Sequence, residues 1–155
     1  MRHIFGEQYL WLEATARTAT TKAKPAPPNN IVQSCRKFGL EEGYLVNRWR
    51  DSLAELAKTG PVALWGAGAK GVTLANLVDP ERSLVACVVD LNPQKQGKYL
   101  PGTGHPIINY LDLPLFQVKY AVQMNPNYTD ENIALLRDAQ LPVTLVNLHD
   151  LREIK

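Results

Sequence analysis

The sequence predicts a three-layer α/β fold, in which a mostly parallel sheet carries helices on both faces. Three observations predict it. Apolar strand-like runs alternate with helix-like segments from residue 61 onward, and this alternation typically builds a parallel sheet. The run from Leu84 to Asp90 is continuously apolar up to its last residue, as in a strand buried on both faces. A Gly66-x-Gly68-x-x-Gly71 turn joins an apolar strand to a helix, which is the glycine pattern of a dinucleotide-binding turn.

The first sixty residues are expected to contain a strand, a linker and a long helix. Residues 5–13 alternate well enough from Gln8 to form a strand. Residues 15–30 are rich in Ala, Thr, Lys and Pro, which is typical of an extended linker. Residues 31–58 have a helical pattern whose apolar stripe we expect to pack in the core rather than to contact a ligand. This stripe consists of Leu45, Trp49, Leu53 and Leu56. We therefore divide the chain into residues 1–30, a strand and linker from a preceding domain, and a second domain of residues 31–155.

The second domain continues with alternating strands and helices. Strands are expected at residues 61–65, 84–90, 119–124 and 143–148, with a short one at 107–108. Helices are expected at 69–77 and 129–139, with a helical turn at 111–115. In the last helix, Thr129 or Asp130 is the expected N-cap, and Ile133 and Leu136 are expected to face inward.

Composition and charge exclude several classes of protein. The formal net charge is +2, from 17 basic and 15 acidic residues, which gives no electrostatic case for binding nucleic acid or a membrane surface. Neither a signal peptide nor a membrane-spanning run is expected from the apolar segments. Cys35 and Cys87 without a secretory leader fit a reducing cytoplasm. The histidines are scattered, so no metal site is predicted.

The glycine turn is the first candidate site. The backbone N–H groups of Gly66, Gly68, Lys70 and Gly71 could hold a phosphate at the start of the following helix, where the helix dipole also favours an anion. Lys70 could add a positive charge, and Asp90, about 20 residues beyond the turn, could accept hydrogen bonds from ribose hydroxyls. The alternative stays open that the turn is empty, because every doubly wound domain needs a tight first turn.

Two further segments carry candidate substrate-binding residues. The loop from residue 90 to 107 follows a strand, where ligands bind in open α/β sheets, and it contributes Asn92 and Lys95. Asn125 and Tyr128 follow the strand 119–124 and could hydrogen-bond a ligand in the same crevice, although Asn125 could equally well cap a turn. His105 is interpreted as a loop residue rather than a catalytic base, and no catalytic residue is predicted.

The turn also excludes two kinds of site. A turn that binds S-adenosylmethionine typically has an acid where this chain has Leu64 and a third glycine where it has Lys70. The Gly-Lys-Ser/Thr sequence of a P-loop is absent. We therefore expect neither a methyl-donor site nor a P-loop here.

Three motifs together resemble one known family. They are the turn Gly66–Gly71, the segment Asp-Leu-Asn-Pro-Gln-Lys-Gln-Gly that begins at Asp90, and Met-Asn-Pro-Asn-Tyr that begins at Met124. They resemble the C-terminal domain of the sugar C-methyltransferase family, over about residues 5–146. The sequence departs from the family pattern at Gly104 and at the residue after it, where the family often has a more apolar pair.

The resemblance implies a Rossmann-like domain with an accessory role. In that family a zinc-binding N-terminal domain and a central S-adenosylmethionine-binding domain precede this one, which helps to form the substrate site. It implies that this chain binds a nucleotide-sugar or another anionic small molecule and no cofactor, and that its partner is a catalytic domain in cis. Methyl transfer by this chain alone is not expected. Two alternatives remain: an NAD(P)-binding oxidoreductase-type domain, or a structural domain that only packs against a catalytic domain.

Overall fold

A computed structural model describes residues 2–4, 9–14 and 30–152, and the chain divides into two compact units, Met1–Phe38 and Gly39–Lys155. In the first unit, β1 (Arg2–Ile4) and β2 (Tyr9–Trp11) form an antiparallel pair. The strand predicted from Gln8 onward is confirmed over Tyr9–Trp11, whereas β1 was not predicted. Residues 5–8 and the predicted linker, apart from its last residue, lie outside the described residues, and the boundary at residue 30 stays a prediction.

Helix α1 (Ile31–Thr59) confirms the long helix predicted before the sheet. Its residues 31–44 are all exposed, and its second half carries the apolar stripe. Leu53 is fully buried, and Trp49 and Leu56 are partly buried against the same core cluster. The prediction that this stripe packs in the core is therefore confirmed for these three residues.

A five-stranded parallel sheet forms the centre of the second unit. The strands are β3 (Val62–Trp65), β4 (Val85–Val89), β5 (Ile107–Ile108), β6 (Tyr120–Gln123) and β7 (Thr144–Asn147). Their order is β5-β4-β3-β6-β7, and every neighbouring pair is parallel. After β3, the chain adds β4 and then β5 on one side of β3. It then crosses to the other side, where β6 pairs with β3 and β7 pairs with β6. Such a reversal opens a crevice at the carboxyl ends of the two central strands.

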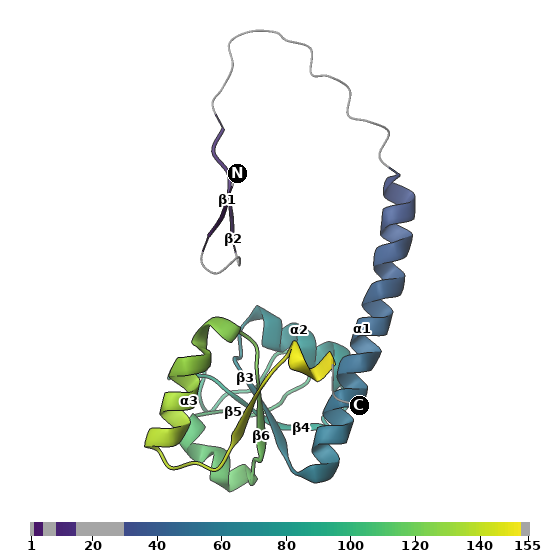
Figure 1. The fold of residues 1–155 in the computed structure, drawn as a ribbon. Coiled ribbons are helices and arrows are strands. Elements are labelled where there is room, and N and C mark those ends of the chain that lie inside the picture. Colours follow the sequence, from purple (N-terminus) through teal and green to yellow (C-terminus); the bar gives the residue numbers. More distant parts are fainter. Residues whose placement is uncertain (1, 5–8, 15–29, 153–155) are drawn as a thin grey trace. The chain divides into compact units, whose positions relative to one another are not determined.

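Helical segments cover both faces of this sheet, which confirms the predicted Rossmann-like α/β fold (Figure 1). Side chains of β3 alternate between two cores, as a strand's period of two requires. Val62 and Leu64 pack on the side of α1 and α2 (Ala69–Val78). Ala63 and Trp65 pack on the side of η1 (Tyr110–Phe116) and α3 (Thr129–Asp138). The glycine turn after β3 therefore lies at the edge of a firmly packed centre.

Two predictions about α3 are wrong. The N-cap is Tyr128 and not Thr129 or Asp130, because the short helix η2 (Pro126–Tyr128) runs directly into α3. Leu136 is buried as predicted, but Ile133 is 48% exposed. The added turn of η2 shifts the point at which the chain enters the helix, which is why the capping pattern of the sequence was misread.

His105 lies in the loop before β5 and is fully buried. Its Nε2 is 3.1 Å from Oδ2 of Asp79, and its Nδ1 is 2.7 Å from Oγ1 of Thr103. Asp79, which follows α2, also accepts the backbone N–H groups of Ser83, Leu84 and Val85. This cluster joins the end of α2 to the loop and to the start of β4. The sequence offered no acid near His105 because Asp79 is 26 residues away.

In the part of the chain that the structure describes, no helix is both long enough and apolar enough to cross a membrane.

Candidate functional site

The three glycines of the turn after β3 differ in what the fold requires of them. Gly66 has a φ of +121°, which L side chains rarely adopt, and its N–H donates to Val89 at 2.7 Å. A Cβ on Gly71 would lie 2.0 Å from the carbonyl oxygen of Gly66, so α2 can pack on the turn only without one. Gly68 has a φ of −91°, and a Cβ there would have nothing within 4 Å. The fold therefore requires Gly66 and Gly71 but not Gly68.

The start of α2 presents the features of an anion site. Gly68 is its N-cap and provides no side-chain cap, while the N–H groups of the first turn of an α-helix have no intrahelical acceptors. Lys70, in this first turn, is exposed. Backbone N–H groups, the positive end of the helix dipole and an ammonium group thus lie together where a phosphate or carboxylate could bind.

Asp90 and Lys95 come together beside the turn and are bonded to it. Oδ2 of Asp90 accepts the N–H of Ala67 at 2.9 Å and the ammonium of Lys95 at 2.9 Å. Lys95 also donates to the carbonyl oxygen of Ala67 at 3.1 Å. The other oxygen, Oδ1, accepts the N–H of Asn92 at 2.9 Å. Both predicted residues thus hold the backbone of the turn in place.

The environment keeps Asp90 ionised. Partial burial raises the pKa of this carboxyl group, but the hydrogen bonds from Lys95, Asn92 and Ala67 together outweigh burial, so the pKa lies below its ordinary value. Three of the roughly four hydrogen bonds that a carboxylate can accept are made within the chain. A ribose that donates two hydroxyl hydrogen bonds to Asp90 would therefore have to displace one of these three donors.

The other predicted residues lie in turns at the same edge of the sheet. Asn92 accepts the backbone N–H of Gln94 at 2.9 Å through its side chain, and it is exposed. Asn125 caps η2, because its side chain accepts the N–H of Asn127 at 3.1 Å. Tyr128 is 46% exposed at the start of α3. The structure thus shows the turn-capping geometry that was one of the two interpretations of Asn125.

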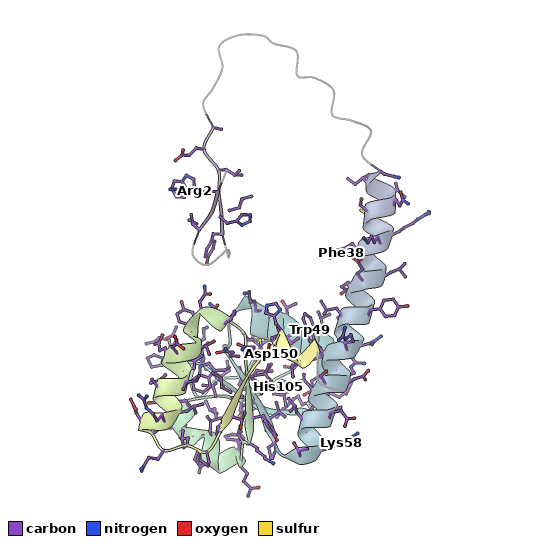
Figure 2. All side chains as sticks on the ribbon, viewed as in Figure 1. Arg2, Phe38, Trp49, Lys58, His105 and Asp150 are labelled. Carbon is purple, nitrogen blue, oxygen red and sulfur yellow. The ribbon has the colours of Figure 1, made fainter. Side chains whose placement is uncertain are left out.

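A pocket of about 410 Å³ lies beside the turn, at the carboxyl ends of β6 and β7. It lies on the α1 and α2 side of the sheet, and Figure 2 shows Trp49 of α1 next to the last helical turn, η3 (Asp150–Arg152). Lys70 is the one predicted site residue that lines it. The lining residues are Trp49, Ala69, Lys70, Thr73, Leu74, Leu77, Gln123, Met124, Pro126, Asn147, Leu148 and His149.

The polar wall of this pocket is held by its own hydrogen bonds. Gln123, at the end of β6, is 1% exposed; its Nε2 donates to Thr129 at 2.5 Å and to Asn147. Its Oε1 accepts from Asn132 at 3.2 Å. Asn147, at the end of β7, donates to Asp150 at 3.0 Å. These amides fix the loops after β6 and β7 and leave the pocket with a preformed wall.

Sequence reasoning missed most of this pocket. Trp49 was interpreted as a core residue, and it does pack on the core, but its pattern could not show that it also lines a cavity. Gln123 had a usable signal, since it is a polar residue at the carboxyl end of an otherwise apolar strand. Among the described residues, no group of three His, Cys, Asp or Glu side chains could hold a metal ion.

Comparison with models of protein families identifies the family of this chain. A family model described as the C-methyltransferase C-terminal domain matches residues 32–140, which is more than half of the chain. A comparison with curated proteins finds no match.

Proposed function

We propose that this chain, which belongs to the family of C-methyltransferase C-terminal domains, forms part of the substrate site of an S-adenosylmethionine-dependent C-methyltransferase. In this role it binds the anionic part of a small molecule, such as the diphosphate of a nucleotide-sugar, and presents the molecule to a catalytic domain of the same protein. The methyl donor binds in that catalytic domain, and this chain supplies no catalytic residue.

Gly68 carries this proposal. Gly66 and Gly71 have reasons within the fold, a positive φ and a close backbone contact, whereas Gly68 has neither. A glycine at this point of the turn lets backbone N–H groups approach a phosphate closely. Because the uncapped start of α2 and Lys70 lie at the same place, an anion there explains all three features.

Asp90 and Lys95 support this role over an NAD(P)-binding one. A dinucleotide site needs the acid after the second strand to accept from ribose hydroxyls. Here Lys95 and two backbone N–H groups already use that acid. We assign this pair to holding the turn, and the substrate to the open side of α2.

Both cysteines are free thiols, which supports a reducing, cytoplasmic location.

Titration of the chain with inorganic phosphate, a nucleotide-sugar, NAD and S-adenosylmethionine, followed by amide NMR shifts, tests the proposal. We expect phosphate and the nucleotide-sugar to shift the amides of residues 68–71, and Gly68→Ala to weaken this binding about tenfold without unfolding the chain. Lys70→Met is expected to weaken it as well, with Lys98→Met as the matched control, since Lys98 is also exposed. A response to NAD but not to the nucleotide-sugar would contradict the proposal, and so would tight binding of S-adenosylmethionine.

A second candidate role is packing against a catalytic domain, and α1 favours it. Leu40 and Tyr44 are 68% and 74% exposed on this helix. Exposed apolar side chains that gather on one element commonly mark an interaction site. If this role holds, Leu40→Glu with Tyr44→Glu will weaken the association of the chain with a separately expressed catalytic domain of the family. Phosphate binding should stay unchanged, and unaltered association would contradict this role.

A further inference from the structure

The hydroxyl group of Thr129 is bonded to two residues of the pocket wall, although Thr129 does not line the pocket itself. Thr129 is the first residue of α3, but Tyr128 is the N-cap of this helix, so the hydroxyl group is not used as a cap. Its Oγ1 donates to the carbonyl oxygen of Pro126 at 2.7 Å and accepts from Nε2 of Gln123 at 2.5 Å. A hydroxyl group has one proton, and Pro126 accepts it. Only the lone pairs of Oγ1 therefore face Gln123.

These lone pairs fix the direction of the Gln123 side-chain amide. Its Nε2 faces Thr129 because it carries the protons, and its Oε1 points the other way, where it accepts from Asn132 at 3.2 Å. A reversed amide would place Oε1 of Gln123 against the lone pairs of Thr129. Gln123 is 1% exposed, so bulk water would not replace a partner that is lost. The buried amide therefore has one favourable direction.

The direction of Gln123 is passed on to the end of β7. The second N–H of Gln123 goes to Asn147, which therefore has to present its Oδ1 to Gln123. The Nδ2 of Asn147 then faces Asp150, whose Oδ2 accepts it at 3.0 Å. A carboxylate accepts hydrogen bonds and donates none, so Asp150 fits this direction and not the reverse. Two acceptors, a hydroxyl group at one end and a carboxylate at the other, thus agree on one direction for both amides.

We propose that Thr129 is a positioning residue of this pocket, whose hydroxyl group sets the direction of the Gln123 and Asn147 amides and so decides which polar atoms the wall presents. Both amides lie at the carboxyl ends of their strands, β6 and β7, where open α/β sheets bind ligands. Polar groups that are held in one orientation before a ligand arrives cost less to order on binding. This role does not depend on which ligand the pocket takes, and it goes beyond the proposed anion site at α2.

Substitution of Thr129 in the whole 155-residue chain tests this role. Thr129→Val keeps the shape of the side chain and removes the hydroxyl group, whereas Thr129→Ser keeps the hydroxyl group. We expect Thr129→Val to shift the side-chain NH₂ signals of Gln123 and Asn147 in NMR spectra. In urea unfolding it should lower the folding equilibrium constant about tenfold, because a buried N–H loses its acceptor. Thr129→Ser should resemble the wild type in both measurements, and Thr144→Val, at an exposed position of β7, is the matched control.

A second substitution, at Asp150, separates this role from a local effect of Thr129. An amide at residue 150 donates as well as accepts, so Asp150→Asn tolerates the reversed direction. In the wild type it should change stability little, because the hydrogen bond that it alters is exposed. Combined with Thr129→Val, it should raise the folding equilibrium constant about threefold, because Gln123 and Asn147 can then reverse together and turn an oxygen toward the apolar side chain at position 129. Asp51→Asn, at an exposed position of α1, is the control and should recover nothing.

The direction of the amides is also measurable in the wild type, so the role of Thr129 stays testable if Thr129→Val does not fold. Nuclear Overhauser contacts between the NH₂ protons of Gln123 and the γ-methyl group of Thr129 are expected, and their absence would overturn the proposal. Unchanged NH₂ signals of Gln123 and Asn147 in Thr129→Val would overturn it too. Equal effects of Thr129→Val and Thr129→Ser would show that the hydroxyl group is not what matters. If Asp150→Asn recovers nothing in Thr129→Val, Thr129 acts only on its own neighbours, and the proposal is wrong.

Discussion

Substitution of Gly71 by alanine should destabilise the domain far more than the same change at Gly68. The new Cβ at residue 71 would lie 2.0 Å from the carbonyl oxygen of Gly66, whereas a carbon and an oxygen need more than about 3 Å. The backbone of either α2 or the turn therefore has to move by about 1 Å. Because α2 packs on β3 through buried Leu74, neither can move without opening the core.

We expect Gly71→Ala to lower the free energy of unfolding by about 3 kcal/mol, which is at the upper end of the loss that overpacking a core causes. For a domain of this size that lowers the melting midpoint by about 10 °C. Gly68→Ala is the control, because its φ of −91° suits any residue and its Cβ meets no atom. Its expected effect is within about 0.5 kcal/mol, since the weaker N-cap is offset by the lower entropy of the unfolded chain.

The assay is urea and thermal unfolding, followed by circular dichroism, of the wild type and both variants. A Gly71→Ala chain as stable as the wild type would refute the reasoning, because it would mean that the turn adapts without cost. Equal losses in both variants would refute the claim that only two of the three glycines serve the fold.

Three further predictions concern buried polar and titratable groups. Asp90 has a lowered pKa in the folded chain, so its contribution to stability is present above the unfolded value, 3.8 in a model compound, and is lost as pH falls through the folded value. In urea unfolding at a series of pH values, the advantage of the wild type over Asp90→Asn should therefore shrink only below about pH 4. Asp79→Ala leaves several donors unsatisfied and should cost about 3–5 kcal/mol in urea unfolding, whereas Ser83→Ala removes one hydrogen bond of 3.2 Å and should cost about 1 kcal/mol. Similar costs would contradict this role of Asp79. Burial raises the pKa of Cys87 to about 12, so at neutral pH a thiol reagent should modify exposed Cys35 quickly and Cys87 only after unfolding. Fast modification of both thiols would show that the core around Cys87 opens readily.

Local spacing by itself determined the fold class of this protein. The apolar run that ends at Asp90 and the glycine turn predicted a parallel sheet because a buried strand and a tight strand-to-helix turn each depend on neighbouring residues. Every strand predicted after residue 60 is present, within one or two residues at each end. The start of α3 was misread because Asn125 caps a short helix that the local pattern did not reveal.

Only the tertiary structure shows which contacts the candidate site residues make within the chain. The sequence predicted Asp90 and Lys95 as substrate-binding residues, which stays a prediction, and the fold shows that they also bind the turn and each other. The sequence also placed Trp49 in the core, and the fold brings this residue together with His149, from the other end of the domain, around a pocket. Whether a polar group faces a ligand or its own chain depends on which distant segments pack beside it, and no local spacing records that.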